Sequence, residues 1–260
     1  MSGELSPIDR AKYVAAKRAV EFVEDGMRVG LGTGSTAAWM VRHLAEVVHD
    51  EGMQISCVAT SSRTAELARK MKLQVTTLDE VKWLDLTIDG ADEFDPQLNL
   101  IKGGGGALLQ EKIVATASDR MIVITDVSKQ VAQLGHFPLP VEVVPFGWET
   151  TKTLIEETLI NLSVVGRTGR LRLTQNGPFV SDEGNYIVDL DLLQIENPRQ
   201  VSLVLNQIPG VVENGLFIDI CDMVLIGNSD ATVEIRDINS GSIKQEQVEV
   251  ATSTNVFSDL

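Results

Sequence analysis

The first 130 residues alternate short apolar segments with helical ones, and this alternation limits the possible folds more than any other feature. The apolar segments are rich in valine, isoleucine and leucine, and the segments between them repeat apolar residues with the period of a helix. We expect strands at residues 27–32, 54–59, 73–76, 84–88 and 121–125, and helices at residues 6–23, 37–48, 64–71 and 108–117. This order favours a parallel sheet covered by helices on both faces, as in Rossmann-like α/β domains.

The pattern changes after residue 134. Further strands are expected at residues 141–144, 171–174, 186–190 and 211–217, with helices at residues 149–160 and 198–208. This βαββαβ order is typical of a ferredoxin-like unit. We therefore predict an α/β fold in which a Rossmann-like catalytic domain (residues 1–134 and 222–236) carries an inserted, smaller ferredoxin-like α+β domain. The insert (residues 135–221) is expected to serve as a lid or in oligomerisation, and residues 237–260 form a polar tail of unknown role.

Polar and glycine-rich segments directly follow several predicted strands, at residues 32–36, 60–64, 89–92 and 126–129. Because ligands bind beyond the carboxyl ends of the strands in such sheets, these segments should meet at one rim. The first of them, Gly32-Thr33-Gly34-Ser35-Thr36, connects a strand to a helix N-terminus, which favours an anion. It lacks the lysine of a Walker A loop and the third glycine of a dinucleotide fingerprint, so a small phosphorylated ligand is favoured over NAD.

Carboxylates and one lysine surround a run of four glycines. Asp89 and Asp92 follow the strand at residues 84–88, Lys102 directly precedes the glycines at 103–106, and Glu111 follows them. Carboxylates near a lysine suit proton transfer beside a developing negative charge. Each group alone also fits an ordinary structural reading, as an acidic turn, a surface lysine or a solvated helical glutamate.

The charge of the chain restricts its partners. The formal net charge is −15, which repels nucleic-acid phosphates and anionic lipid, so we expect neither nucleic acid nor membrane as a partner. The N-terminal residues lack the apolar core of a signal peptide, and we expect a cytoplasmic protein. No spacing of histidines, cysteines or carboxylates indicates a metal site, so we predict no metal and no cofactor.

Taken together, these motifs resemble the signatures of the type A ribose-5-phosphate isomerase family. The resemblance rests on Gly32–Thr36, Asp89-Gly90-Ala91-Asp92-Glu93 and Lys102-Gly103-Gly104-Gly105 with Glu111, and it extends from about residue 12 to residue 227. It implies interconversion of ribose 5-phosphate and ribulose 5-phosphate without cofactor or metal, by a homodimer or homotetramer. The fourth glycine, Gly106, departs from the family pattern, which has an alanine there.

The resemblance also implies roles for individual residues. Glu111 would move a proton between two carbons through an enediolate, Asp89 would assist ring opening, and Asp92 would share the proton traffic. Lys102 and the glycine amides would stabilise the enediolate oxygen. Substrate contacts are implied at Lys12, Thr33, Gly34, Ser35, Thr36, Asp89, Gly90, Ala91, Asp92, Lys102, Gly103, Gly104, Gly105 and Lys129.

Other functions remain open from the sequence. A sugar-phosphate sensor could use the same sheet to bind its effector without turnover. A nicotinamide-dependent dehydrogenase is disfavoured because Ser35 replaces a glycine and no acidic residue follows the second strand. A metal-dependent isomerase would need a cluster of ligands that the sequence does not indicate.

Overall fold

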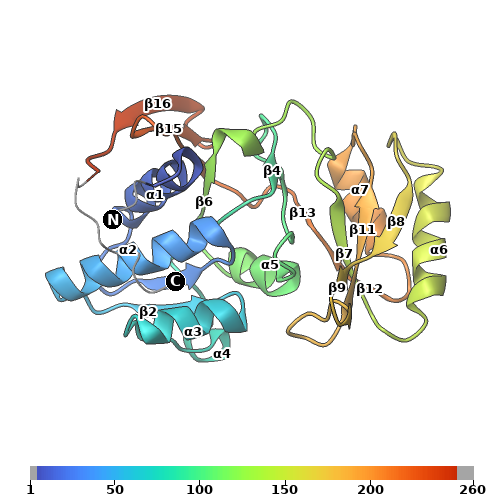
Figure 1. Ribbon diagram of the computed structural model, residues 1–260, viewed down its shortest axis with the longest axis horizontal. Coiled ribbons are helices and arrows are strands. Elements are labelled where there is room, and N and C mark those ends of the chain that lie inside the picture. Colours follow the sequence, from blue (N-terminus) through green and yellow to red (C-terminus); the bar gives the residue numbers. More distant parts are fainter. Residues whose placement is uncertain (1–4, 251–260) are drawn as a thin grey trace.

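The structure is a computed structural model that describes residues 5–250. The chain forms a larger and a smaller unit side by side (Figure 1). The larger unit contains a seven-stranded sheet with the strand order β16-β15-β14-β6-β3-β1-β2. Its strands are β1 (Arg28–Leu31), β2 (Ser56–Ala59), β3 (Leu86–Asp89), β6 (Met121–Asp126), β14 (Met223–Gly227), β15 (Thr232–Asp237) and β16 (Ser242–Gln247). Its helices are α1 (Pro7–Val20), α2 (Ser35–Glu51), α3 (Ser62–Lys70), α4 (Leu78–Val81), α5 (Leu108–Thr116) and the 3-10 turn η1 (Val127–Lys129).

The order of the parallel strands determines where a ligand can bind. β1 pairs in parallel with β2 on one side and with β3 on the other, and β3, β6 and β14 continue in parallel. The chain therefore reverses its direction across the sheet between β1 and β3. In doubly wound sheets, the carboxyl ends of the strands at such a switch point form the ligand site.

Alternating side chains of the central strands pack on opposite faces of the sheet. In β6, Ile122 and Ile124 join the core that includes α1 and α2, whereas Met121 and Val123 pack against Phe94 and Phe217 on the other face. Both faces are covered, which explains why all six residues of β6 are buried. The prediction of a Rossmann-like α/β unit is confirmed.

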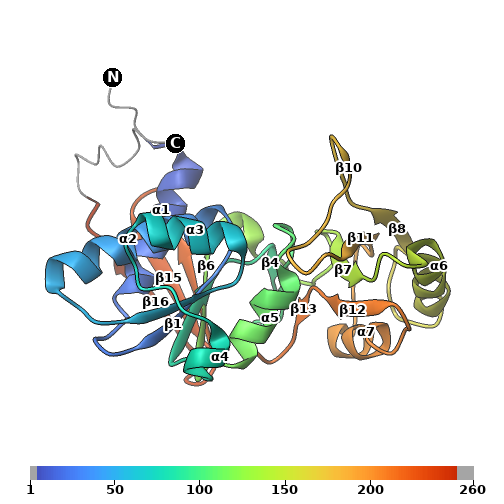
Figure 2. The same ribbon diagram turned by 90° about the horizontal axis from the view of Figure 1, so that it is seen from below.

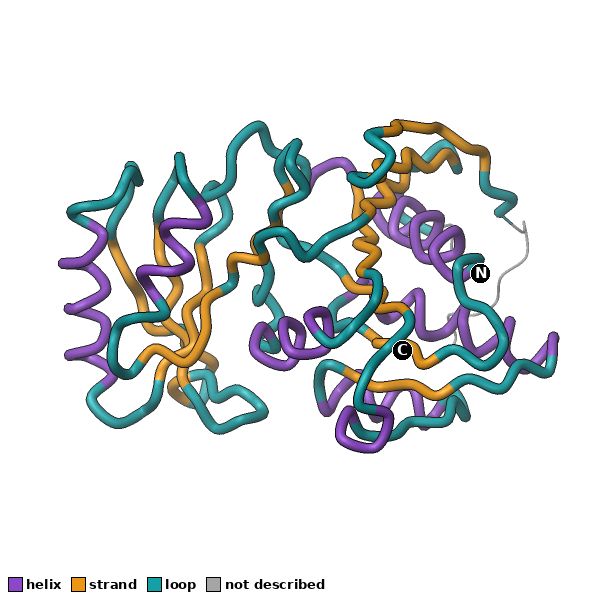
Figure 3. The backbone as a smooth tube through the Cα atoms, turned by 180° about the vertical axis from the view of Figure 1, so that it is seen from behind, coloured by secondary structure: helices purple, strands orange, loops and turns teal. Residues whose placement is uncertain are grey.

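The smaller unit is a four-stranded antiparallel sheet with the order β12-β7-β11-β8. Its elements are β7 (Leu139–Val143), α6 (Trp148–Leu159), β8 (Thr168–Leu171), β11 (Tyr186–Asp191), α7 (Pro198–Leu205) and β12 (Val211–Asn214), with a short hairpin of β9 (Leu173–Thr174) and β10 (Gly177–Pro178). The order βαββαβ agrees with the predicted ferredoxin-like unit. α6 lies at the far end of the molecule from the larger sheet (Figures 2 and 3), and the β9–β10 hairpin projects from the smaller unit (Figure 2).

A third, small sheet lies between the two units. It has the order β13-β5-β4 and consists of β4 (Glu93–Phe94), β5 (Leu100–Ile101) and β13 (Leu216–Phe217). Ile101 and Leu216 reach the apolar core of the smaller unit, while Phe94 and Phe217 pack under the larger sheet. The segment from β4 to β5 also carries the chain from Asp89 to Lys102.

Three details of the expected secondary structure are wrong. Residues 73–76 make only a single parallel bridge, between Val75 and Cys57, and do not form a strand. Residues 211–217 are two strands on two sheets, since β12 pairs with β7 and β13 with β5. The strand expected at residues 171–174 begins earlier in the chain: β8, at Thr168–Leu171, is the strand that pairs with β11.

The C-terminal segment is more regular than expected. β15 and β16 form an antiparallel hairpin that extends the main sheet from β14. Val233, Ile235 and Val248 are buried in the main core, which explains why this polar segment is ordered. Residues 251–260 of the predicted tail lie outside the described residues. Within residues 5–250, no helix is both long and apolar enough to span a membrane.

Candidate active site

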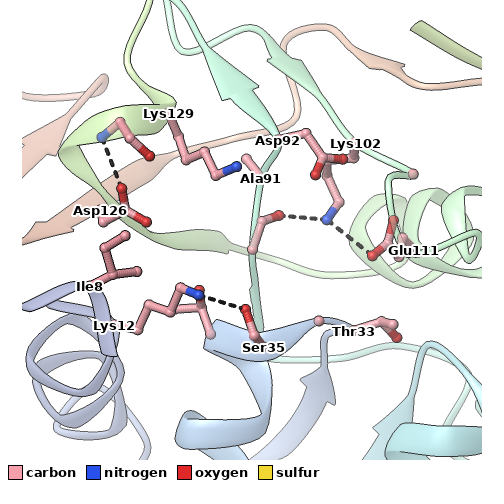
Figure 4. Close-up of a pocket in the computed structure, with 16 residues that line it drawn as sticks. Ile8, Lys12, Thr33, Ser35, Ala91, Asp92, Lys102, Glu111, Asp126 and Lys129 are labelled. Carbon is pink, nitrogen blue, oxygen red and sulfur yellow. Dashed lines mark hydrogen bonds and ion pairs between the residues drawn. The ribbon is translucent and has the colours of Figure 1, made fainter. Parts of the chain in front are cut away.

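A pocket of about 320 Å³ opens beyond the carboxyl ends of β1 and β3, at the switch point of the sheet (Figure 4). It is lined by Ile8, Lys12, Thr33, Gly34, Ser35, Thr36, Gly90, Ala91, Asp92, Lys102, Gly103, Gly105, Glu111, Asp126, Ser128 and Lys129. These residues come from α1, the turn before α2, the segment after β3, the glycines before α5, and η1. Three of the four predicted segments therefore meet at this rim, together with the start of α5, whereas no residue of the fourth, residues 60–64, lines the pocket.

One end of the pocket can hold an anion. Ser35 is the first residue of α2, and the Lys12 ammonium donates to the Ser35 hydroxyl over 3.0 Å. Lys129 enters the lining from η1, on the opposite side of the pocket (Figure 4). Free N–H groups at a helix N-terminus, a hydroxyl and two ammonium groups suit a phosphate.

Thr33 contributes differently from Ser35. Its hydroxyl lies 2.8 Å from the hydroxyls of Thr60 and Ser61 and 3.2 Å from that of Thr64, all of them buried. This hydroxyl cluster connects the ends of β1 and β2. Thr33 therefore fixes the turn that carries Ser35, with its own hydroxyl already bonded inside the protein.

Three charged side chains are buried together at the other end of the pocket. The Lys102 Nζ lies 2.9 Å from Asp89 Oδ2 and 3.3 Å from Glu111 Oε1, and donates to the Gly90 carbonyl over 2.6 Å. Asp89 Oδ1 accepts the N–H groups of Thr33 and Gly90. Glu111 Oε2 is buried without a hydrogen-bond partner among the described residues. Glu111 is only 4% exposed, yet it borders the pocket.

The burial of this cluster shifts its ionisation. Burial raises the pKa of Glu111 to about 8, with nearby Asp89 adding to the rise and Lys102 opposing it. Burial likewise raises the pKa of Asp89. Burial alone would lower the pKa of Lys102, but the charges of Asp89 and Glu111 outweigh it and raise that pKa. One permanent cation therefore faces two carboxyl groups that hold their protons more tightly than usual, and Glu111 can exchange its proton near neutral pH.

The glycine loop, residues 103–106, connects Lys102 to α5. The N–H of Gly104 donates to Asp92 Oδ2 over 2.7 Å. A side chain on Gly104 would overlap the Asp92 carboxylate, because a Cβ there would lie 2.6 Å from Asp92 Oδ1. Gly105 borders the pocket, and within the described part of the chain its N–H has no acceptor. The loop thus brings backbone donors close to Lys102.

Comparison with known families identifies the chain. Residues 56–231 match the family model of ribose 5-phosphate isomerase A (phosphoriboisomerase A). The chain belongs to the ribose 5-phosphate isomerase A family. This matches the resemblance read from the sequence motifs, and it makes the protein an isomerase by family.

Curated relatives and solved structures agree with this family. Ribose-5-phosphate isomerase A of Dinoroseobacter shibae is 80% identical over all 260 residues of both chains, and that of Jannaschia sp. is 71% identical, covering 99% of this chain and 98% of the relative. A solved ribose 5-phosphate isomerase from Plasmodium falciparum has a TM-score of 0.81 at 33% identity, covering 94% of this chain and all of that one. A D-ribose-5-phosphate isomerase solved in complex with phospho-erythronic acid has a TM-score of 0.80 at 38% identity, with the same coverage.

In this member of the ribose 5-phosphate isomerase A family, the predicted site residues lie close together. All of them line the pocket except Asp89 and Gly104. Asp89 is fully buried behind Lys102, and Gly104 meets Asp92; neither belongs to the pocket lining. The proposed site residues did not include Ile8, Asp126 or Ser128, which also line the pocket. Asp126 and Ser128 directly follow β6, so the rule on strand ends pointed to their segment. Ile8 gave no such signal, because an apolar residue in a first helical turn is unremarkable.

Among residues 5–250, no group of three or more histidine, cysteine or acidic side chains is arranged to hold a metal ion.

Proposed function

We propose that the protein interconverts D-ribose 5-phosphate and D-ribulose 5-phosphate in the non-oxidative pentose phosphate pathway, by proton transfer through an enediolate. The observation that carries this proposal is Glu111, a buried carboxyl with a pKa near 8, bordering a pocket beside a permanently charged lysine. A general base works best when its pKa lies near the working pH. The phosphate end at Lys12 and Ser35 fixes the substrate in the same pocket.

Each proton and electron pair in the reaction can be followed. In the open-chain aldose, ionised Glu111 takes the proton from carbon 2, and the electrons of that C–H bond form the enediolate, whose negative charge collects on the oxygen of carbon 1. The Lys102 ammonium and the amide of Gly105 face this oxygen and stabilise it. Glu111 then returns the proton to carbon 1, while the hydroxyl proton of carbon 2 moves to the oxygen of carbon 1. The product is the ketose.

The two aspartates have different places in this scheme. Asp92 lines the pocket and handles the hydroxyl protons during ring opening and enediolate formation. Asp89 lies behind Lys102, where its carboxylate keeps the ammonium charged and in place. This assignment differs from the role that the family resemblance suggested for Asp89, since a group that acts on the sugar ring needs access to the pocket.

The relative solved with phospho-erythronic acid supports the substrate class. That ligand carries a phosphate at one end and a carboxylate at the other, and a carboxylate resembles an enediolate in its pair of oxygens. This pocket likewise has a phosphate end, at Lys12 and Ser35, and a proton-transfer end, at Lys102 and Glu111.

The protein is further proposed to act in the cytoplasm, without nucleic acid or membrane as partner. We also propose that it forms a homodimer or homotetramer, and the exposed Phe146, Ile160 and Val165 of the smaller unit support such association.

The test is turnover of ribose 5-phosphate in excess chelator by the parent protein, by Glu111→Gln and by Glu149→Gln. Glu149 is a matched control, because it is also an acidic residue in the first turn of a helix but is exposed to solvent. We expect activity in the parent and in Glu149→Gln, and a loss of about 10³-fold or more in Glu111→Gln. Binding of ribose 5-phosphate without turnover by the folded parent would instead indicate a sensor.

A further inference from the structure

Arg172, from the smaller unit, reaches the glycine loop of the larger unit. Its Nη1 donates to the Gly103 carbonyl over 2.8 Å and to the Gly104 carbonyl over 3.2 Å. The side chain is only 16% exposed. Arg172 is not part of the pocket lining, so it touches the loop from the side away from the ligand.

Asp189 holds this arginine in a fixed orientation. Arg172 Nε donates to Asp189 Oδ2 over 2.9 Å, and Nη2 donates to Oδ1 over 2.5 Å. Such a two-point pair fixes the plane of the guanidinium. Val188 and Leu190, on either side of Asp189 in β11, lie in the apolar core, so Asp189 lies on the opposite face of the smaller sheet. The centre of the Phe179 ring lies 5.7 Å from the guanidinium carbon, so the ring also packs near the guanidinium group.

Two bonded carbonyls determine where two N–H groups point. In a trans peptide, the C=O of one residue and the N–H of the next lie on opposite sides of the bond. Arg172, together with the N–H of Gly106 that donates over 2.9 Å, holds the carbonyl of Gly103 on its own side, which directs the Gly104 N–H away, onto Asp92 Oδ2 at 2.7 Å. It turns the carbonyl of Gly104 in the same way, which directs the Gly105 N–H to the pocket side of the loop. A cation on the carbonyls also polarises both peptides and strengthens their N–H donors.

We propose that Arg172, fixed by Asp189, is a positioning residue for the isomerisation: it sets the peptide planes of the glycine loop so that the amides of Gly104 and Gly105 face Asp92 and the enediolate oxygen. This inference rests on the proposed isomerase function. It gives the smaller unit a direct effect on the chemistry. The phosphate end of the pocket makes no contact with Arg172 and is unaffected.

The experiment compares Arg172→Met with Arg170→Met in the full chain. Arg170 is the matched control, since it is two residues away and pairs with Asp191 over 2.7 Å, but its side chain is 74% exposed. For Arg172→Met we expect kcat to fall about 100-fold, as when one oxyanion donor is lost, with KM changed by less than about threefold. Arg170→Met should retain the kcat and KM of the parent protein.

Two further measurements separate positioning from a general loss of structure. Phospho-erythronic acid, whose carboxylate resembles the enediolate, should lose affinity in Arg172→Met roughly in proportion to kcat/KM. Guanidinium ion at tens of millimolar, but not sodium chloride at the same concentration, should restore part of the lost kcat by occupying the vacated space beside the two carbonyls. A purely structural role would give neither result.

The outcomes distinguish this inference from the proposed function. An inactive parent protein overturns both. An active parent, with Arg172→Met within about twofold of its kcat, overturns only the role of Arg172. If Arg172→Met does not fold, Asp189→Asn provides the test, because it keeps the arginine but loosens its orientation; an unchanged kcat and unchanged affinity for phospho-erythronic acid in that variant also overturn the inference.

Discussion

Two lysine–carboxylate clusters lie on either end of the same short stretch of chain, and they differ in how their charges are balanced. The ammonium groups of Lys102 and Lys112 lie 5.5 and 5.0 Å from the ring centre of Phe217. Lys102 is shared between Asp89 and Glu111: the ammonium is paired with Asp89 Oδ2 and lies 3.3 Å from Glu111 Oε1, while Glu111 Oε2 is buried without a hydrogen bond among the described residues. Lys112 has one carboxylate, Glu213.

Among the described residues, the second cluster has no buried side-chain oxygen or nitrogen without a hydrogen bond. Glu213 Oε1 accepts from Lys112, from Asn206 Nδ2 and from the Asn214 N–H, and Lys112 also donates to the Asn214 carbonyl. Although burial opposes it, the pKa of Glu213 is lowered by the charge and hydrogen bond of Lys112. The pKa of Glu111 is raised instead. A one-to-one pair that leaves no buried atom unbonded holds its charge and stabilises the fold, whereas two carboxyls that share one lysine beside a pocket leave one of them free to exchange a proton.

Exchanging each lysine for methionine is the strongest test of this difference. Lys102→Met removes the cation that faces the enediolate, and we expect kcat to fall about 10³-fold or more. Lys112→Met leaves Glu213 partly buried without its cation, so we expect a loss of about 2 kcal/mol in the free energy of unfolding, with kcat nearly unchanged. Steady-state kinetics and urea unfolding of both variants measure these effects. Equal losses of kcat in both would contradict the distinction.

The dependence of stability on pH should have opposite signs in the two clusters. The pKa of Glu111 in the folded protein is about 8, above its ordinary value of 4.5, so its contribution to stability is complete below 4.5 and is lost as the pH rises through 8. The loss is at most about 1.4 kcal/mol per pH unit in that window. Glu213 has a lowered pKa, so its contribution is present at neutral pH and is lost as the pH falls.

Thermal unfolding between pH 4 and 9 checks both signs. Relative to the parent protein, Glu111→Gln should gain stability as the pH rises from 5 to 8, and Glu213→Gln should lose less stability as the pH falls. In the parent protein, kcat/KM should decrease as the pH falls below about 8, because the base becomes protonated. A pH–rate profile that shows only an ionisation near 4.5 would rule out the raised pKa.

The loop between the two lysines can be perturbed at Gly106. This residue has a φ of +81°, and a Cβ there would lie 2.2 Å from the ring of Phe179 in the smaller unit. We expect Gly106→Ala to cost about 2 kcal/mol, from the left-handed conformation and from displacement of the ring.

Gly184→Ala is the matched control, because Gly184 also has a φ of +81° but has open space around its Cβ position. It should cost only the conformational part, about 1 kcal/mol. Adding Phe179→Val to Gly106→Ala should recover the part of the lost stability that comes from displacement of the ring. Urea unfolding of the single and double variants measures this recovery. No recovery in the double variant would show that the ring does not restrict position 106.

The sequence predicted correctly where the parallel strands end and which polar residues follow them. It did not predict how the buried charges shift each other's pKa. Asp89 and Ser35 could be placed on one rim because parallel strands end at one edge and each polar segment follows an apolar run. The raised pKa of Glu111 depends on burial and on two groups 9 and 22 positions away in the chain, which no local pattern reports. Arg172 was missed for a similar reason. It shares its local sequence with the exposed Arg170, and only the packing of the smaller unit on the glycine loop makes the two arginines different.

Glu142 offers the contrast with the smallest expected effect, because it is buried like Glu111 but does not line the active-site pocket. It is fully buried on β7, opposite Glu213 of β12, and burial raises its pKa. Ser181 Oγ and Asn185 Nδ2 both donate to its Oε1, while Oε2 is buried without a hydrogen bond among the described residues. Glu142→Gln keeps the accepting oxygen, so we expect a change of less than about 1 kcal/mol in the free energy of unfolding, and an unchanged kcat.

The control is Glu142→Ala, which leaves Ser181 and Asn185 without their acceptor and should cost about 2–3 kcal/mol. Urea unfolding and kinetics of both variants separate the hydrogen bonds from the charge. A tenfold loss of kcat in Glu142→Gln would mean that the proton on this carboxyl matters to the reaction, and that burial with a raised pKa is enough to couple a distant group to the site. An unchanged kcat would leave the pocket and the shared lysine as the features that separate Glu111 from a glutamate that is merely buried.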